Sequence, residues 1–350
     1  MALAFSNLTA FYNHGFDAVI DVRSPAEFTA DHIPGAINLP SLSNDERAEV
    51  GTIYKQVSPF KARKVGASLV LSNVAKHIAG PLQNYDGAWR PLIYCWRGGQ
   101  RSGVFTTLLK EVGWRAEVVE GGYQTYRRLV QKSLYDVPIS HRFILLDGYT
   151  GTAKTAALNQ LPELGVQSID LEGLAGHRGS LLGEMPGGQP EQRMFESRLA
   201  LALHKCDPLQ PVVLEAESSK IGQLILPPSL WKAMLNAPRI HIEAPLDTRV
   251  EYISDAYRDI LLDPETVTHR LAPLRRLRSH AVVDQWRDLQ RAGDLQGLAR
   301  SLIEEHYDPA YATARKKRDH VTLAQVESER LDPSGINKTA ETVAEIVRSL

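Results

Sequence analysis

Two apolar runs of this chain each end at a glycine-rich loop that leads directly into a helix-like segment. The first run gives LIYCWRGGQRSG at residues 92–103, and the second gives RFILLDGYTGTAKTAAL at residues 142–158. A buried strand, a tight glycine turn and a helix in this order form the repeating unit of parallel α/β sheets. The sequence therefore predicts an α/β protein, with chemistry concentrated at the two loops.

Further strand and helix patterns lie on both sides of a linker-like segment, SLYDVPISH, at residues 133–141. Within the first half, a charged stretch after residue 42 predicts two helices around a Ser-Pro break. Beyond residue 247 the chain shows amphipathic helix patterns, and we expect no strand there. The predicted domains are a parallel-sheet domain at residues 1–135, a second α/β domain at residues 140–247, and a helical, basic C-terminal region at residues 248–350.

Composition limits the classes of protein and partner to consider. A length of 350 residues suits two or three domains, and the net charge of −1 gives no global basic field, so contact with nucleic acid would need a local patch. No run approaches the ~20 apolar residues of a membrane span, and the N-terminus lacks the pattern of a signal peptide. We therefore expect a cytoplasmic protein without a membrane partner. Two cysteines and scattered histidines predict no structural metal.

The first loop places Cys95 where a strand ends and a helix is about to begin. The thiolate is the reactive form of cysteine, and loop N–H groups, the helix N-terminus and two arginines all favour it. The same groups would hold an anion beside the sulfur. The alternative is that Cys95 is an inert cysteine of the core. Cys206 has no glycine-rich basic loop beside it and is interpreted as structural. The candidate site is Cys95 with an anion-binding loop of Arg97, Gly98, Gly99, Arg101 and Ser102.

The segments DVRSPAEF, HIPGAINLP, the Cys95 loop and EGGYQTY, in this order, resemble a rhodanese domain that covers residues 1 to about 130. The resemblance implies that Cys95 is the active-site cysteine, and that Asp21, Arg23 and His32 are architectural. Five residues separate Cys95 from Arg101, one more than in common single-domain sulfurtransferases. Rhodanese-like dual-specificity phosphatases share this spacing, which leaves room for a larger chalcogen or a phosphorus oxyanion. Tyr94 rather than histidine precedes the cysteine, which argues against a phosphatase.

The second loop, GYTGTAKT at residues 148–155, differs at one position from the phosphate-loop pattern G-x-x-x-x-G-K-[ST]. It follows a strong apolar strand and precedes a helix, as a phosphate loop requires. Ala153 replaces the usual glycine and needs a backbone conformation compatible with a Cβ atom. We therefore expect a P-loop NTPase-like domain, in which Lys154 bridges phosphate oxygens and Thr155 holds Mg²⁺. The candidate phosphate-binding residues are Gly148, Thr150, Gly151, Thr152, Lys154 and Thr155.

Two other segments of this domain hold polar side chains at predicted strand ends. PVVLEAESSKIG ends in Glu215 and Glu217, which are candidates for organising a metal ion or water, or else solvated carboxylates. DLEGLAGHRGSLLG combines an acid pair with basic residues and glycines, which suits an anionic or nucleobase ligand or a plain connecting loop. Its candidate ligand-binding residues are His177, Arg178 and Ser180.

An arginine-rich segment follows in the helical region. Residues 270–300 contain seven arginines and three aspartates. Arginine-rich helix faces bind phosphate backbones, although a solvated helix face is the alternative. HYDPAYATARKKRDH at residues 306–320 adds two tyrosines for a stacking surface. The candidate RNA-binding residues lie on one expected helix and are Arg270, Arg275, Arg276 and Arg278.

CWRGGQRS, DGYTGTAKT, DLEGLAGHRGS and EAESSKIG, in this order, resemble the bacterial tRNA 2-selenouridine synthases over nearly the whole chain. The resemblance implies conversion of wobble 2-thiouridine into 2-selenouridine. The sulfur is first S-geranylated from geranyl diphosphate, and the geranylthio group is then replaced by selenium from selenophosphate. It further implies the anticodon region of tRNA as partner, delivery of selenophosphate by its synthase, and no DNA.

The expected roles are Cys95 as the thiolate of the selenium step and the phosphate loop, with Mg²⁺, as the holder of the geranyl diphosphate. That the loop holds geranyl diphosphate rather than ATP is a hypothesis. Two other functions stay open. One is an ATP-dependent sulfurtransferase that uses a Cys95 persulfide, and the other is a nucleotide-gated rhodanese module that regulates without RNA.

Overall fold

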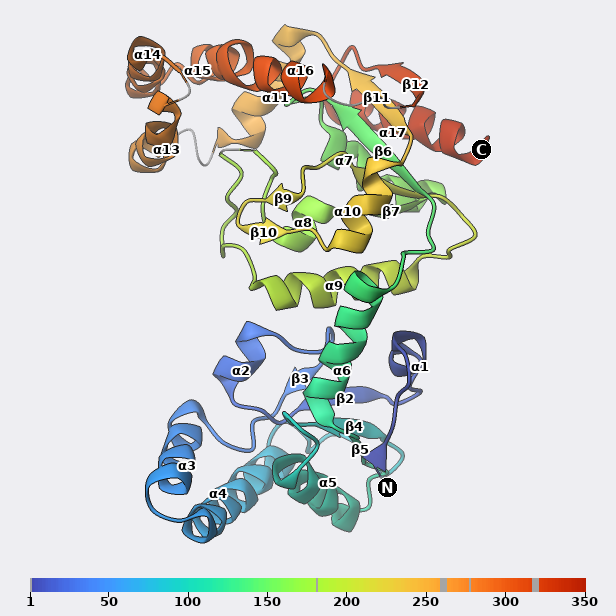
Figure 1. The fold of residues 1–350 in the computed structure, drawn as a ribbon, viewed down its shortest axis with the longest axis vertical. Coiled ribbons are helices and arrows are strands. Elements are labelled where there is room, and N and C mark those ends of the chain that lie inside the picture. Colours follow the sequence, from blue (N-terminus) through green and yellow to red (C-terminus); the bar gives the residue numbers. More distant parts are fainter. Residues whose placement is uncertain (1, 181, 259–262, 277, 317–320) are drawn as a thin grey trace. The chain divides into compact units, whose positions relative to one another are not determined.

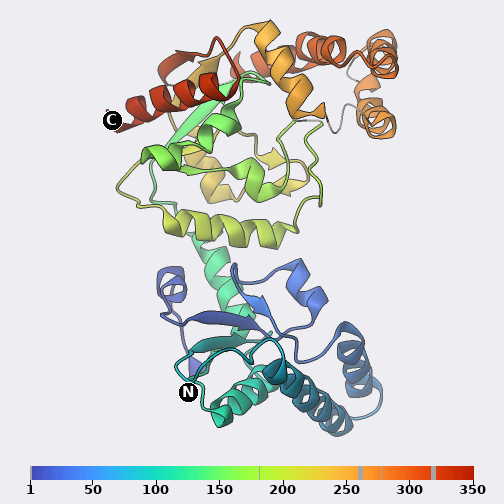
Figure 2. The same cartoon turned by 180° about the vertical axis from the view of Figure 1, so that it is seen from behind.

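The computed structural model describes residues 2–180, 182–258, 263–276, 278–316 and 321–350. The chain divides into two compact units. The first comprises Met1–Val137 and Pro190–His204, and the second comprises Pro138–Gln189 and Lys205–Leu350. Figures 1 and 2 show the elements of each unit from opposite sides.

A five-stranded parallel sheet with the order β1-β5-β4-β2-β3 forms the centre of the first unit. Strand β4 lies in its middle, and all four residues of β4 are buried, as expected for a continuous apolar run in a parallel sheet. The predicted parallel-sheet α/β domain is confirmed. The strands are β1 (Ala2–Leu3), β2 (Ala18–Asp21), β3 (Ile37–Asn38), β4 (Pro91–Tyr94) and β5 (Glu117–Val119).

The helices of the first unit include an antiparallel pair, α3 and α4, joined at the predicted Ser-Pro break. Ser58 caps α4 by accepting a hydrogen bond from Lys61, and Pro59 occupies the first helical position, where a missing N–H costs nothing. The helices are α1 (Leu8–Tyr12), α2 (Pro25–Ala30), α3 (Asn44–Gln56), α4 (Pro59–Ala79), α5 (Gln100–Val112), α6 (Gly122–Gln131), the π-helical turn η1 (Lys132–Asp136) and α9 (Gln192–Lys205).

Helix α9 belongs mostly to the first unit although it is distant in sequence. The buried Glu196 forms an ion pair with Arg127 of α6, and Glu196 also accepts a hydrogen bond of 2.6 Å from the hydroxyl of Tyr135. A buried carboxylate requires such partners, so this cluster fixes α9 against α6 and η1.

The second unit contains another five-stranded parallel sheet, with the order β12-β11-β6-β8-β7. Strand β6, which precedes the phosphate loop, lies in the middle, and all six of its residues are buried. The ends of β6, β8 and β7 therefore bring three loops to one edge of the sheet. The strands are β6 (Phe143–Gly148), β7 (Gln167–Ile169), β8 (Val212–Glu215), β11 (Arg239–Glu243) and β12 (Thr322–Glu327), beside an antiparallel pair, β9 (Lys220–Ile221) and β10 (Leu224–Ile225).

The expectation of no strand in residues 248–350 is wrong, because β12 pairs with β11 at the edge of this sheet. Its sequence, TLAQVE, mixes apolar and polar residues, and only Val326 is buried. An edge strand makes hydrogen bonds on one side and buries few side chains, so its apolar pattern is weak. The end of the region that was predicted to be wholly helical thus completes the second sheet.

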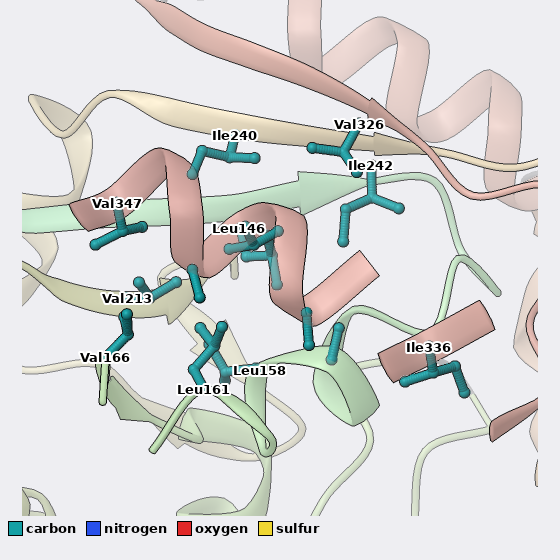
Figure 3. Close-up of a cluster of buried hydrophobic side chains, with 14 of the residues drawn as sticks. Leu146, Leu158, Leu161, Val166, Val213, Ile240, Ile242, Val326, Ile336 and Val347 are labelled. Atoms are coloured by element: carbon teal, nitrogen blue, oxygen red, sulfur yellow. The ribbon is translucent and has the colours of Figure 1, made fainter. Parts of the chain in front are cut away.

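The core of the second unit joins β6, β8, β11 and β12 to the C-terminal helix α17 (Figure 3). Leu146 and Val213 of the sheet, Leu158 after the phosphate loop, and Ile336 and Val347 of α17 belong to one buried cluster. The helices of this unit are α7 (Lys154–Leu158), α8 (Leu171–Ala175), α10 (Pro228–Leu235), α11 (Leu246–Ala256), α13 (Pro264–Leu271), α14 (His280–Arg291), α15 (Leu295–Leu302), α16 (Asp308–Lys316) and α17 (Pro333–Arg348), with short helical turns η2 (Leu161–Leu164), η3 (Ala272–Arg276) and η4 (Ile303–Tyr307).

Helices α13, α14 and α15 pack around the buried Trp286 in a separate small core. The arginines of residues 270–278 do not lie on one helix, as was predicted, because α13 ends at Leu271 and η3 follows it. Pro273 has no N–H group with which to continue an α-helix. In the part of the chain that the structure describes, no helix has both the length and the apolar character needed to cross a membrane.

Candidate functional site

The Cys95 loop lies between β4 and α5, pressed against the turn from β5 to α6. Gly98 has φ +67°, and a Cβ atom there would lie 2.7 Å from the carbonyl oxygen of Val119. A Cβ atom on Gly122 would lie 2.2 Å from the carbonyl oxygen of Cys95. Both positions therefore require glycine, which explains Gly98 of WRGG and Gly122 of EGG by one packing contact.

Backbone hydrogen bonds from α6 hold the carbonyls of this loop. The N–H of Tyr123 donates to the oxygen of Cys95 at 2.8 Å, and the N–H of Gln124 donates to the oxygen of Trp96 at 3.1 Å. The backbone N–H groups of Arg97 and Ser102, in turn, hydrogen-bond the sulfur of Cys95. The loop thus directs N–H groups to the sulfur, an arrangement that can also hold an anion.

The thiol of Cys95 lies inside this loop and is only 3% exposed. Burial raises its pKa, but the Ser102 hydroxyl, the N–H groups of Ser102 and Arg97, and the charge of Arg101 together lower the pKa below its usual value. The Ser102 hydroxyl donates directly to Sγ at 3.1 Å. A buried cysteine with these partners is set up to form a thiolate, whereas burial raises the pKa of Cys206.

The two arginines of the loop differ in their surroundings. Arg101 donates to the Glu27 carboxylate of α2 at 3.0 Å, and Arg47 of α3 lies 3.6 Å from the same carboxylate. Arg97 is exposed. Glu27 therefore positions Arg101 beside the sulfur, while the side chain of Arg97 is accessible to a ligand.

Asp21, Arg23 and His32 form part of the scaffold. Arg23 is 1% exposed, donates to both oxygens of Asp21, and donates to the carbonyl of Asp31 at 2.6 Å. Tyr94, the residue before the cysteine, donates its hydroxyl to Asp21 at 2.7 Å. The ring of His32 stacks on Phe28 of α2. This buried network fixes the ends of β2 and β4 below the loop.

The phosphate loop of the second unit connects β6 to α7. A Cβ atom on Gly148 would lie 2.5 Å from the carbonyl of Ile242, so β11 requires glycine at this position. Ala153 adopts the left-handed conformation, with φ 55°, and among the described residues no other non-glycine residue has a positive φ. A left-handed non-glycine residue costs on the order of 1 kcal/mol, and such strain collects at functional loops.

Lys154 and Thr155 begin α7 at the open end of this loop. The Lys154 ammonium donates to the carbonyl oxygens of Gly148 at 2.8 Å and Tyr149 at 3.1 Å. Thr152 is buried, and its hydroxyl donates to the oxygen of Tyr149 within the turn, so it stabilises the loop. The hydroxyl of Thr155 donates to Glu172 of α8 at 3.0 Å.

Glu172 and Glu217 form a carboxyl pair beside Thr155. The two side chains share a hydrogen bond, and burial together with Glu217 raises the pKa of Glu172 to about 8. Glu215 is buried and accepts a hydrogen bond of 2.8 Å from the N–H of Leu171, and burial raises its pKa well above the usual value. Of the two predicted glutamates, only Glu217 borders the cavity described next.

A cavity of about 820 Å³ lies at the carboxyl ends of the strands of the second unit. One side is formed by the phosphate loop with Lys154 and Thr155, next to Glu172 and Glu217. Thr150 and Gly151 also border it. Its lining also contains five aromatic side chains, together called the aromatic wall here: Trp231, Tyr252, Tyr257, Tyr307 and Tyr311.

Arg178 and Ser180 of the predicted ligand loop also border this cavity, whereas His177 is not among its lining residues. The Arg178 guanidinium lies 5.1 Å from the ring centre of Tyr257, and the Ser180 hydroxyl is 3.2 Å from the Tyr257 hydroxyl. Arg178 thus brings a positive charge to the aromatic wall.

Tyr307 and Tyr311, which were expected on an RNA-stacking surface, instead line the cavity. The Tyr311 hydroxyl donates to Asp147 at the end of β6, which fixes this ring over the phosphate loop. The basic residues at 317–320 of the same predicted surface lie outside the described residues.

The predicted RNA-binding arginines take part in contacts within the second unit. Arg270 forms an ion pair with Glu184, and Arg275 forms one with Asp284. Arg278 donates to the carbonyl of His306 at 3.2 Å, and Arg276 is exposed. Part of the charge of this segment is therefore compensated by neighbouring carboxylates.

Glu172 and the aromatic wall were not named as candidates from the sequence. Glu172 stands in an acid pair of the loop DLEG, and that pair was the one available signal. The aromatic residues come from α10, α11, η4 and α16, so their convergence depends on tertiary structure.

Comparison with known proteins agrees with this arrangement. Residues 7–129 match the rhodanese-like domain family, and residues 141–269 match the family described as tRNA 2-selenouridine synthase AAA domain. The protein named tRNA 2-selenouridine synthase from Hahella chejuensis is 35% identical over 329 residues, which cover 86% of each chain. The protein of the same name from Pseudomonas syringae pv. syringae is 34% identical over 86% of this chain and 89% of its own. The chain therefore belongs to the tRNA 2-selenouridine synthase family.

Proposed function

We propose that this protein converts the wobble 2-thiouridine of tRNA into 2-selenouridine in two steps, S-geranylation from geranyl diphosphate and then replacement of the geranylthio group by selenium from selenophosphate. The main support is the cavity of the second unit, which combines a phosphate loop with an aromatic wall. A prenyl diphosphate has a strongly anionic end and an apolar tail. The phosphate loop could hold the anionic end, and the aromatic side chains could hold the tail.

In the geranylation step, the 2-thio sulfur of the uridine forms a bond to C1 of the geranyl group as the bond from C1 to the diphosphate oxygen breaks. The N3 proton of the base passes to solvent. The electrons of the broken bond leave with the diphosphate. In this proposal Lys154, which lines the cavity, and the N–H groups of the phosphate loop stabilise the charge that develops there. The tail would lie against Trp231 and the tyrosines.

Mg²⁺ would suit the polar end of this cavity. Thr155 supplies a hydroxyl and Glu172 and Glu217 supply carboxyl oxygens, which are the hard ligands that Mg²⁺ prefers. Burial and the neighbouring Glu217 raise the pKa of Glu172, and a bound cation would offset the repulsion between the two carboxyl groups. When bound, the ion would neutralise phosphate charge and favour departure of the diphosphate.

In the selenium step, a bond forms between C2 of the base and selenium while the bond from C2 to sulfur breaks and geranylthiol leaves. Water takes the phosphoryl group of selenophosphate, so the exchange is redox-neutral. The Cys95 loop, with Arg97 and Arg101, would hold the selenophosphate oxyanion. Cys95 acts there as a thiolate, either as the selenium carrier or as the group that expels geranylthiol.

The test separates the two steps with Lys154→Ala. We expect loss of geranylation of 2-thiouridine tRNA, measured by nucleoside mass spectrometry, with selenation of pre-geranylated RNA intact. Lys338→Ala, an exposed lysine on α17, is the matched control and should leave both steps unchanged. The reverse pattern, with geranylation intact and selenation lost, would remove the assignment of geranyl diphosphate to this loop.

ATP is the second candidate ligand of this cavity, because the matching domain family is described as an AAA domain. In that case the protein would activate an oxygen with ATP and transfer sulfur from a Cys95 persulfide. Incubation of 2-thiouridine tRNA with selenophosphate and geranyl diphosphate, without any nucleotide, distinguishes the two. Formation of 2-selenouridine supports the first function, and a strict requirement for ATP supports the second.

A further inference from the structure

The turn between α3 and α4 in the first unit exposes apolar side chains that the core does not use. Tyr54 is 57% exposed, Val57 is 62% exposed, and Phe60 is 73% exposed. Isolated exposed apolar residues are normal on protein surfaces, but here three of them lie within seven residues at one helical turn. Such a group indicates a contact surface.

The same segment has an unusual charge pattern. From Val50 to Tyr85 the sequence contains no aspartate or glutamate, but it contains five lysines and arginines: Lys55, Lys61, Arg63, Lys64 and Lys76. The first four surround the turn and are exposed. With a net charge of −1 for the whole chain, this is a local basic patch of the kind that contact with a polyanion requires.

Aromatic and basic side chains alternate over the hairpin surface. Phe60 and Lys64 are separated by four residues on α4, so they lie on one face of the helix, and Lys61 is three residues from Lys64. Tyr54 and Lys55 end α3 on the other side of the turn. Exposed rings on which bases can stack, next to cations that contact phosphates, are the features that bind single-stranded RNA.

The hairpin is also connected to the Cys95 loop. Asn44, the first residue of α3, accepts a hydrogen bond of 3.0 Å from the N–H of Ala26, and Arg47 lies 3.6 Å from Glu27, which holds Arg101. From there α3 extends for 13 residues, or about 20 Å. The tip therefore lies at the far end of a helix whose base contacts Ala26 and Glu27 of α2, and Glu27 positions Arg101.

We infer that the tip of the α3–α4 hairpin, formed by Tyr54, Lys55, Val57, Phe60, Lys61, Arg63 and Lys64, is an RNA-binding surface that contacts the tRNA several nucleotides away from the reacting base. The inference rests on the proposed function for the identity of the RNA. It assigns RNA binding to the first unit, at residues distinct from the arginines of 270–278.

The test uses the full-length protein and two double variants, Tyr54→Ala with Phe60→Ala, and Lys61→Ala with Lys64→Ala. Lys110→Ala with Arg115→Ala removes two exposed charges elsewhere in the first unit and is the matched control. Affinity for substrate tRNA is measured by fluorescence anisotropy at several salt concentrations, and turnover is measured by nucleoside mass spectrometry.

We expect the aromatic variant to bind tRNA about tenfold more weakly with an unchanged salt dependence, because stacking is lost while the charges stay. The lysine variant should bind more weakly and reduce the slope of log K against log salt by about 1.4–1.8, for two lost phosphate contacts. The control should stay within about twofold of wild type. For both hairpin variants KM should rise while kcat at saturating tRNA is unchanged, since the tip does not touch the reacting atoms.

Wild-type affinity in the aromatic variant would overturn the inference, as would equal weakening in the control. A loss of self-association or of binding to anionic lipid vesicles, with tRNA affinity unchanged, would assign the surface to a protein or a membrane instead. These results would leave the proposed function intact if wild type modifies tRNA. No binding of tRNA by wild type would overturn both.

Discussion

Replacing Glu172 by glutamine should stabilise the ligand-free protein at alkaline pH and impair its phosphate site. Glu172 lies against Glu217 and accepts a hydrogen bond from Thr155, and burial together with Glu217 raises its pKa from 4.5 to about 8. Because the folded state binds this proton more tightly than the unfolded state, the proton stabilises the fold fully below about pH 4.5. That stabilisation is lost as the pH rises towards 8.

The size of the effect follows from the shift. Each pKa unit corresponds to about 1.4 kcal/mol, so the rise to about 8 is equivalent to about 5 kcal/mol. Screening by solvent and relaxation of the pair reduce this, and we expect about 2–4 kcal/mol. Glutamine keeps an N–H donor for Glu217 at every pH and does not ionise. Glu172→Gln should therefore match wild type near pH 5 and exceed it by about 2–4 kcal/mol near pH 8.5.

Calorimetric unfolding of the ligand-free, full-length protein between pH 5 and pH 9 measures this difference. The transition of the second unit should shift, and that of the first unit should not. Glu163→Gln, at an exposed position of η2, is the control for removing one carboxylate. Parallel pH profiles for wild type and Glu172→Gln would refute the reasoning, because they would show that Glu172 shares no proton with Glu217. The same variant should lose Mg²⁺-dependent geranylation, so stability and activity change in opposite directions.

Two predictions concern the first unit. Ser102→Ala removes the hydroxyl that donates to Sγ, so the pKa of the Cys95 thiol should rise and alkylation of Cys95 by iodoacetamide at pH 7 should slow by up to about tenfold, with the second cysteine as an internal control. An unchanged rate would contradict this role of Ser102. Arg23→Leu leaves the buried Asp21 without its ion-pair partner and should lower the free energy of unfolding by about 3–5 kcal/mol in thermal denaturation, and adding Asp21→Asn should restore part of the loss. A loss below about 1 kcal/mol would contradict the structural importance of this pair.

The central strands and their loops could be predicted from the sequence because local patterns determine them. Strands β4 and β6 are continuous apolar runs, and each ends at glycines whose positions exclude a Cβ atom. The conformation of Ala153 was not evident from its sequence context. It adopts a left-handed conformation, with φ 55°, which is unfavourable for a residue that has a Cβ atom.

Strand β12 and the aromatic wall could not be predicted, because long-range packing forms them. β12 buries only Val326 and exists because β11 offers a free edge. Tyr307 and Tyr311 lie in a helical segment rich in basic residues, and this local pattern fits an RNA-binding surface as well as it fits a cavity wall. The place of Tyr311 in the cavity depends on Asp147 at the end of β6, more than 150 residues earlier in the chain.

A run of charged residues in the sequence also does not show which oppositely charged side chains will lie beside it in the folded protein. Residues 270–278 contain four arginines and no acidic residue. In the structure, however, Glu184 forms an ion pair with Arg270, and Asp284 forms one with Arg275. The hairpin of α3 and α4 was predicted as two ordinary charged helices. Only the structure reveals that the rings of Tyr54 and Phe60 at its tip are mostly exposed.

The Cys95 loop and the phosphate loop are both proposed to bind anions, but the charged groups around them differ. At Cys95, Glu27 is bound to Arg101, and loop N–H groups and the charge of Arg101 lower the pKa of the thiol, so this site favours an anion without an added cation. At the phosphate loop Lys154 faces a carboxyl pair that repels a diphosphate unless it binds a proton or a cation. If the proposed function holds, a diphosphate would therefore enter the second unit together with Mg²⁺ or a bound proton, whereas an anion at Cys95 would require neither. Under the proposal, the two units would then differ in the condition for binding their anions.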